Sequence, residues 1–148
     1  MDRPILFIEN GLTISQLVME RLSANGYSCR HILASSQPQV VTDRLSVLDT
    51  DGRHADIELG DYPVAILDRD FGDSAPGQEL VSALTIAGIT CFSFRFRRGK
   101  PDLDAFDSFL REELPTIYTL PRSQGSLVGK VIKRILRFFW RGFEWLIN

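Results

Sequence analysis

Polar side chains at the ends of three apolar segments have the types that phosphoryl chemistry needs. Glu9 and Asn10 follow the first apolar run, Asp68 ends a central one, and Ser93 lies in a third. Carboxylate oxygens are preferred ligands of Mg²⁺, and an aspartate can accept a phosphoryl group. A nearby cation must also neutralise the charge that develops on the phosphoryl oxygens. These residue types therefore suggest a site related to phosphoryl transfer.

Alternating strands and helices must position these residues. The run YPVAILD at 62–68 is continuously apolar, which is typical of a central strand covered on both faces. Leu17, Val18 and Leu22 have helical spacing, and Asn25-Gly26 supplies a stop signal. The expected strands are 4–8, 27–33, 62–68, 90–96 and 116–120, and the expected helices are 13–25, 76–87 and 102–114.

This order predicts a three-layer α/β fold with a (βα)5 parallel sheet. Sites in such sheets lie outside the carboxyl ends of the strands. Residues 38–60 interrupt the alternation with two short strand-like runs around the turn signal Asp49-Thr50-Asp51-Gly52. We therefore expect an inserted hairpin or loop before the third strand. The length of 148 residues and the apolar fraction of 44% fit one globular domain.

Three segments resemble the receiver domain of response regulators, which has a flavodoxin-like fold. They are ILFIEN with its following helix and NGY, then LDRDFGDSAPGQEL, then IYTLPRSQGSLVGKVIKRIL. The resemblance covers the chain apart from about residues 38–60 and the last ten. It implies that Asp68 is the phosphoacceptor, that Glu9 belongs to a magnesium-binding acidic pair, and that Ser93 is the hydroxyl residue ending the fourth strand.

Two positions depart from the receiver pattern. Asn10 stands where the second acid is expected, and Leu120 stands where the family keeps a lysine. We therefore expect a degenerate pseudo-receiver with no catalytic activity and no resident cofactor, with magnesium only if Glu9 and Asp68 function. Lys100-Pro101 is an alternative Lys-Pro pair, but too few residues separate it from Ser93 for a helix and a strand.

Other interpretations of the acids remain open. Asp68 could be phosphorylated despite these departures, as in a working single-domain response regulator. Glu9, Asp68 and Asp70 could serve a magnesium-dependent Toprim-like enzyme, and D-x-D also occurs in haloacid-dehalogenase-like phosphatases. Asp68, Asp70 and Asp73 could instead simply cap the turn before the next helix. His31 and His54 have no metal-ligand spacing, so packing or surface roles are expected for them.

The cysteines and the amino terminus bear on location. Cys29 and Cys91 lie in apolar strand-like stretches, where a free thiol behaves as a small hydrophobe, so we expect reduced thiols. The apolar run Ile5 to Ile8 is too short for the core of a signal peptide. A cytoplasmic protein is therefore expected, with a peripheral location at the inner face of a membrane as the alternative.

A basic run follows the fourth strand. Guanidinium groups suit bidentate recognition of phosphate, so this run is a candidate anion-binding site for a sensor of an anionic ligand. A solvated loop that balances an acidic body is the alternative. The residues are Arg95, Arg97, Arg98 and Lys100.

The C-terminal segment is basic and rich in aromatic residues. Six basic residues and one acid give 122–148 a net charge of +5, which leaves −7 for residues 1–121. We expect a receiver-like body at 1–125 and a tail at 126–148, in which the fifth helix is extended as an amphipathic segment too short in apolar sequence to span a bilayer. Its expected partner-binding residues are Phe138, Phe139, Trp140, Phe143, Trp145, Lys133, Arg137 and Arg141.

Large aromatic side chains beyond the domain's own core mark a contact surface. The expected function is therefore that of a signalling or assembly adaptor that docks on another protein, in a larger assembly or a homo-oligomer. A basic helix with tryptophan also fits a bilayer surface, so peripheral membrane contact is the competing possibility. Nucleic acid is not the expected partner.

Overall fold

A parallel β-sheet forms the centre of the computed structural model, which describes residues 3–12, 14–68 and 75–119. Its four strands pair in the order β2-β1-β6-β7. Every residue of β1 and β6 is buried, which explains their unbroken apolar sequence. The strands are β1 (Ile5–Glu9), β2 (Cys29–Leu33), β6 (Val64–Leu67) and β7 (Thr90–Ser93).

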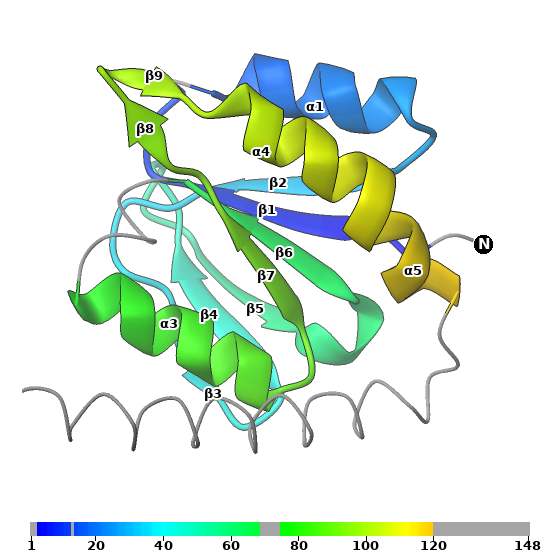
Figure 1. Ribbon diagram of the computed structural model, residues 1–148. Coiled ribbons are helices and arrows are strands. Elements are labelled where there is room, and N and C mark those ends of the chain that lie inside the picture. The colour runs from blue at the N-terminus through cyan, green and yellow to red at the C-terminus, as the bar shows by residue number, and fades with distance from the viewer. Residues whose placement is uncertain (1–2, 13, 69–74, 120–148) are drawn as a thin grey trace, which may run out of the picture.

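The sheet is the middle of three layers, as Figure 1 shows. The upper layer contains α1 (Ser15–Ala24) and a long helix made of α4 (Leu103–Ser108), the π-helical turn η2 (Phe109–Glu113) and α5 (Leu114–Thr119). The lower layer contains α3 (Ala75–Ile86) and a second, antiparallel sheet. The expected three-layer α/β architecture is therefore present around these four strands.

Two apolar clusters hold the layers together, because neighbouring residues of a strand face opposite sides of the sheet. Leu6 and Ile8 of β1 belong to the cluster between the parallel sheet and the layer of α3 and the antiparallel sheet. Ile5 and Phe7 belong to the cluster under α1 and the α4–α5 helix. In the second cluster the ring centroids of Phe92 and Phe109 lie 4.8 Å apart, and this contact joins β7 to the long helix.

The antiparallel sheet fills the segment between β2 and β6. It consists of β3 (Gln39–Val41), β4 (Arg44–Leu48) and β5 (His54–Glu58), followed by the short 3-10 helix η1 (Leu59–Asp61). The turn between β4 and β5 is fastened by Asp49, whose Oδ1 accepts the backbone N–H groups of Asp51 and Arg53. The expected inserted hairpin is confirmed, with one further strand.

The fifth parallel strand expected at 116–120 is wrong for the described part of that range, because residues 114–119 form α5. The run TIYTL at 116–120 predicted a strand, with the preceding helix ending at residue 114. The helix instead passes the proline through η2, where the N–H of Leu114 donates to the carbonyl of Phe109. This wider turn gives room for a ring that would clash with a carbonyl in a regular helix. Leu114, Ile117 and Tyr118 then pack on the core with helical spacing.

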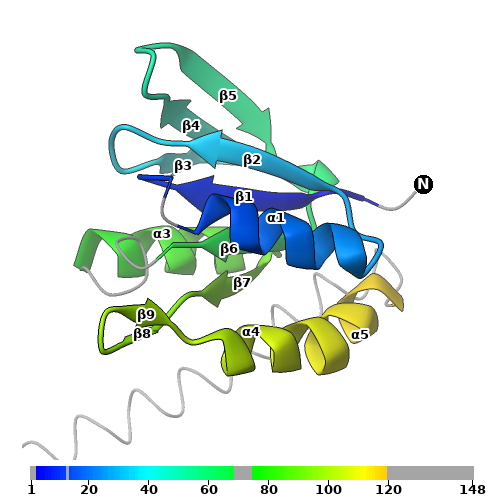
Figure 2. The same cartoon turned by 90° about the horizontal axis from the view of Figure 1, so that it is seen from above.

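The two ends of the sheet carry different structures. Beyond the carboxyl end of β7, β8 (Phe96–Arg97) and β9 (Lys100–Pro101) form a small antiparallel hairpin. At the amino end of β1, the hydroxyl of Tyr118 donates to the carbonyl of Arg3 at 2.6 Å and anchors α5. Figures 1 and 2 both show the hairpin and α5 at opposite ends of the described part of the molecule.

Candidate functional site

Glu9 lies at the carboxyl end of β1 and is fully buried. Its Oε1 accepts the backbone N–H of Ile14 at 2.9 Å, just before α1. The first N–H groups of a helix lack partners within the helix, and a carboxylate there also interacts favourably with the helix dipole. Oε2 lies 3.1 Å from Nε2 of His31 on β2. Both oxygens of this carboxylate therefore contact polar groups of the fold itself.

Asp68 follows β6 at the same edge of the sheet, next to Glu9 in the parallel register. Only 6% of its surface is exposed. Its Oδ2 accepts the backbone N–H of Asn10 at 2.8 Å, and its own N–H donates to the carbonyl of Ile8. Asn10 itself is exposed. The two acids thus hold the backbone of the loop between β1 and α1.

Ser93 is not brought to this pair. The register places it beside Leu67, whose side chain packs on the α3 side of the sheet. Phe92 and Phe94 pack on the α1 side, so Ser93, which alternates with them, faces the other way. Glu9 lies on the α1 side, where it meets Ile14. The residue beside Asp68 in the register between β6 and β7 is therefore Phe94, with its buried ring, rather than a residue with a hydroxyl group.

The donor set does not fit the magnesium ion that the receiver resemblance implies. Mg²⁺ requires near-octahedral oxygen ligands, usually with several waters. Glu9 is closed to solvent and already contacts Ile14 and His31. Across the residues that the structure describes, no group of three His, Cys, Asp or Glu side chains could hold a metal ion.

The sequence did not indicate the contact between Glu9 and His31. The signal lay in the register, which pairs His31 with Phe7 and so places it on the same face as Glu9, two residues further along β1. The imidazole stacks on Phe7 with ring centroids 4.9 Å apart. His31 thus has the packing role expected for it, with a specific polar partner.

The basic run forms the β8–β9 hairpin. All four of its basic residues, Arg95, Arg97, Arg98 and Lys100, are exposed. Arg97 contacts Asp102, with Nε and Oδ2 3.3 Å apart. Lys100 lies in β9, so the alternative Lys-Pro pair belongs to a surface hairpin.

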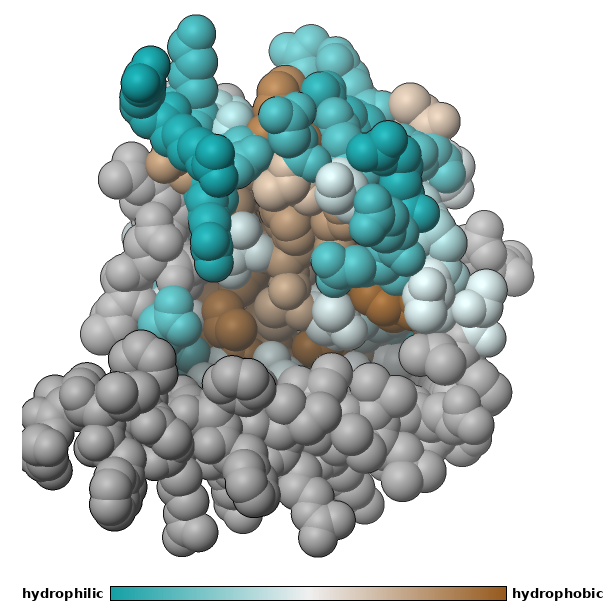
Figure 3. All heavy atoms as spheres, in the orientation of Figure 1, coloured by the Kyte–Doolittle hydropathy of each residue, from teal (hydrophilic) through white to brown (hydrophobic). Residues whose placement is uncertain are grey.

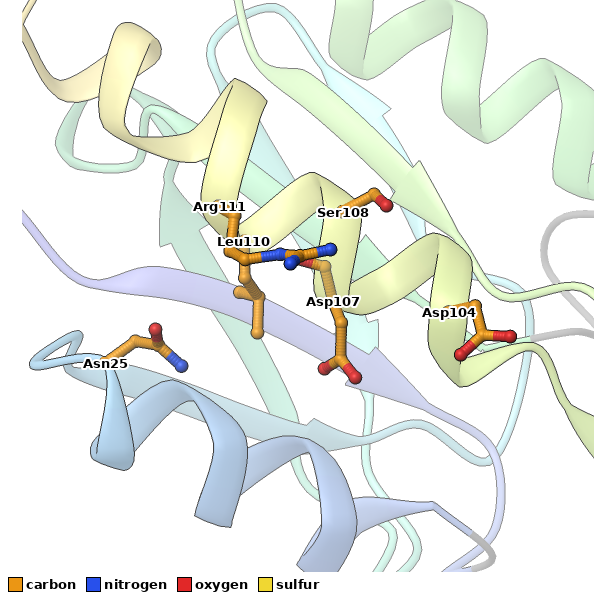
Figure 4. A pocket seen from close by; sticks show the side chains of 6 residues that line it. All are labelled: Asn25, Asp104, Asp107, Ser108, Leu110 and Arg111. Atoms are coloured by element: carbon orange, nitrogen blue, oxygen red, sulfur yellow. The ribbon is translucent and has the colours of Figure 1, made fainter.

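A surface depression lies elsewhere, between the end of α1 and the α4–η2 helix (Figure 4). Its volume is about 460 Å³, and charged and polar side chains dominate its lining. Asp107, which lines the depression, pairs with Arg21, with Nε and Oδ1 3.0 Å apart. None of the candidate chemical residues lines it, so it is separate from the Glu9–Asp68 pair. The lining residues are Asn25, Asp104, Asp107, Ser108, Leu110 and Arg111.

Both cysteines are free thiols, as expected. Burial raises the pKa of Cys29 to about 11. Burial also raises the pKa of Cys91 to about 12, against a smaller opposing effect of a hydrogen bond with Thr85. A thiolate is the reactive form of cysteine, so these groups are poor nucleophiles at neutral pH.

Several predicted residues lie outside the described residues. They are Asp70, Asp73, Leu120 and the tail 126–148 with its aromatic and basic side chains. Among the helices that are described, none combines the length and apolar character needed to cross a bilayer. No family model matches the sequence, and no match is found among curated proteins or solved structures.

Proposed function

We propose that this chain is a non-catalytic pseudo-receiver that acts as a signalling or assembly adaptor by docking on another protein. The observation that carries the proposal is the state of Glu9. In a magnesium site this carboxylate would face the ion, but here it is fully buried and contacts Ile14 and His31. An acid with this role stabilises the β1–α1 loop rather than a transition state.

The strand order supports the receiver-like part of the proposal. Counting only the parallel strands, the order is second, first, third, fourth. This is the order of a flavodoxin-like sheet up to its fifth strand. The antiparallel insertion replaces the helix that would connect the second and third of these strands. Such a scaffold, with its acids used in packing, fits a module that has kept the fold and lost the chemistry.

The tail at 126–148 is the proposed docking segment. The α1 side of the sheet is already covered by the α4–α5 helix, through Phe106, Phe109, Leu110 and Leu114, all of them buried. The apolar side chains of the tail are therefore not needed to close that face. A surface made of Phe138, Phe139, Trp140, Phe143 and Trp145 would gain a large driving force from burial against a partner. We place another protein there, with a bilayer as the competitor.

The test compares tail variants in the full chain. Trp140→Ala with Phe143→Ala should reduce recovery of the chain's native complex at least tenfold, measured by quantitative co-purification from its own cells. The matched control is Leu12→Ala with Ile86→Ala, which removes apolar residues that are 71% and 65% exposed on the body and should leave recovery unchanged.

Two results would contradict this part of the proposal. One is equal recovery of the complex with both variants. The other is loss of folding, seen by circular dichroism, when residues 138–148 are removed. That outcome would assign the aromatic residues to the protein's own core.

A further inference from the structure

The β8–β9 hairpin projects a concentrated positive charge from the carboxyl end of the sheet. Arg97 pairs with Lys100 in the hairpin register, and Arg98-Gly99 forms the two-residue turn between them. Figure 3 shows hydrophilic side chains gathered over this hairpin, at the upper left of the molecule. Four basic side chains thus lie within six consecutive residues, 95–100.

These charges are almost unopposed within the described part of the chain. Arg97 is 84% exposed even though it contacts Asp102. The side chains of Arg95, Arg98 and Lys100 are exposed and make no ion pair with another described residue. A guanidinium in this state can form two parallel hydrogen bonds to a carboxylate.

The hairpin is held firmly at its base. Phe96 packs against the core cluster of the α1 side. The backbone N–H of Asp102 donates to the carbonyl of Arg95 at 2.8 Å and closes the hairpin. The Oδ1 of Asp102 also accepts the N–H of Ala105 and caps α4. The basic groups therefore start from a fixed platform, which lowers the entropic cost of binding.

The tip is occupied by a residue that the turn geometry does not favour. Arg98 has φ 52° and Gly99 has φ 75°. Two positive φ values are the requirement of a type I′ turn, for which Asn-Gly and Asp-Gly are preferred. Arginine is an uncommon choice at the first of these positions. Its presence at the tip suggests that the side chain has a use that outweighs the strain.

The contrast between the basic hairpin and the acidic rest of the body indicates which kind of anionic partner can bind. With the hairpin's four cations set aside, the rest of residues 1–121 carries a net charge of −11. An extended polyanion such as a nucleic-acid duplex or an anionic bilayer would be repelled by this body. A short acidic peptide segment can contact the hairpin alone. The tip also offers no exposed aromatic side chain on which a base could stack.

We propose that the β8–β9 hairpin is a recognition element for an acidic segment of a partner protein, with Arg95, Arg98 and Lys100 as the contact residues. The hairpin residues are different from the residues of the tail, and α5 ends at the opposite end of the sheet from the hairpin. The inference thus goes beyond the adaptor function, and either proposal can fail without the other.

The probe is an N-acetylated octaglutamate peptide titrated into the full chain at 50 mM salt, followed by backbone amide shifts in NMR. We expect saturable shifts at residues 95–102, with binding weakened at 0.5 M salt because the contacts are exposed. Arg95→Gln with Arg98→Gln and Lys100→Gln should raise Kd at least tenfold. Arg98→Asn alone should weaken binding without lowering Tm, because asparagine suits the turn.

Matched controls separate this site from general attraction. Arg44→Gln with Arg53→Gln and Arg111→Gln removes the same charge from other exposed positions and should change Kd less than twofold. Trp140→Ala with Phe143→Ala should leave peptide binding unchanged, whatever it does to complex recovery.

Three results would overturn the proposal. The first is equal weakening by the two triple variants. The second is a set of shifts confined to the tail. The third is tighter binding of duplex DNA or phosphatidylserine vesicles through the same three hairpin residues.

Discussion

Glu9 shows how a residue type that suggests chemistry can instead serve the fold. A buried carboxylate is costly unless its oxygens are satisfied, and here Ile14 and His31 satisfy them. Asp68 acts in the same way on the N–H of Asn10. At this scale the two acids hold the β1–α1 loop, and their position at the carboxyl ends of the strands does not by itself make them catalytic.

Glu9→Ala should lower the free energy of unfolding by about 2 to 3 kcal/mol, because it leaves the buried N–H of Ile14 without an acceptor. Glu9→Gln keeps an oxygen at this position and should recover part of the loss. Urea denaturation with and without magnesium measures both, and Glu20→Ala on the exposed side of α1 is the control. Stabilisation of the parent by millimolar magnesium that is lost in Glu9→Gln would indicate a metal ligand instead.

The thiols provide a second test at this scale. Because burial raises the pKa of Cys29 to about 11, only about a thousandth of it is thiolate at pH 8. Alkylation by iodoacetamide at pH 8 should therefore be much slower in the folded chain than in urea. A native labelling rate equal to the unfolded rate would show that the thiol is not buried.

The same pKa shifts predict how the stability of the fold changes with pH. The folded-state pKa values, about 11 for Cys29 and about 12 for Cys91, lie above the ordinary thiol pKa of 9.0. The unfolded chain therefore loses these protons first as the pH rises. The thiols favour the folded state fully below pH 9, and this contribution is lost as the pH approaches 11 to 12.

At the scale of elements, the sequence predicts those strands and helices that are recognised from the apolar pattern of a single segment. The buried strands β1 and β6, the helices α1 and α3 and the insertion were all found this way, with ends shifted by only a few residues. The strand prediction at 116–120 was wrong because the run TIYTL is typical of a strand, and no local pattern predicts that a π-helical turn will carry the helix past Pro115. The orientation of Ser93 was missed because it depends on register between strands.

Thr116→Ala tests the helical assignment of this segment. Thr116 is exposed, and alanine has the higher helix propensity, so the variant should be more stable by about 0.5 kcal/mol. Thr116→Gly should be less stable than the parent. Thermal or urea denaturation measures both. A loss of stability in Thr116→Ala would favour a strand, in which threonine is the better residue.

At the scale of the whole molecule, the two ends of the sheet have different properties. One end carries the buried acids and the basic hairpin, and the other carries the end of α5 beside Arg3. The sequence thus contains an acidic body, a cationic hairpin and a basic aromatic tail, and this division supports the proposed contact function. We propose that this contact function does not involve phosphorylation of Asp68.

The most direct test is the intact mass of the full chain after incubation with acetyl phosphate and magnesium. We expect no change in mass, because Glu9 contacts Ile14 and His31 rather than an ion, and Ser93 faces away. Asp68→Asn, treated in parallel, should give the same result. A stoichiometric phosphate adduct on the parent chain that is absent from Asp68→Asn would contradict the account and identify a working response regulator.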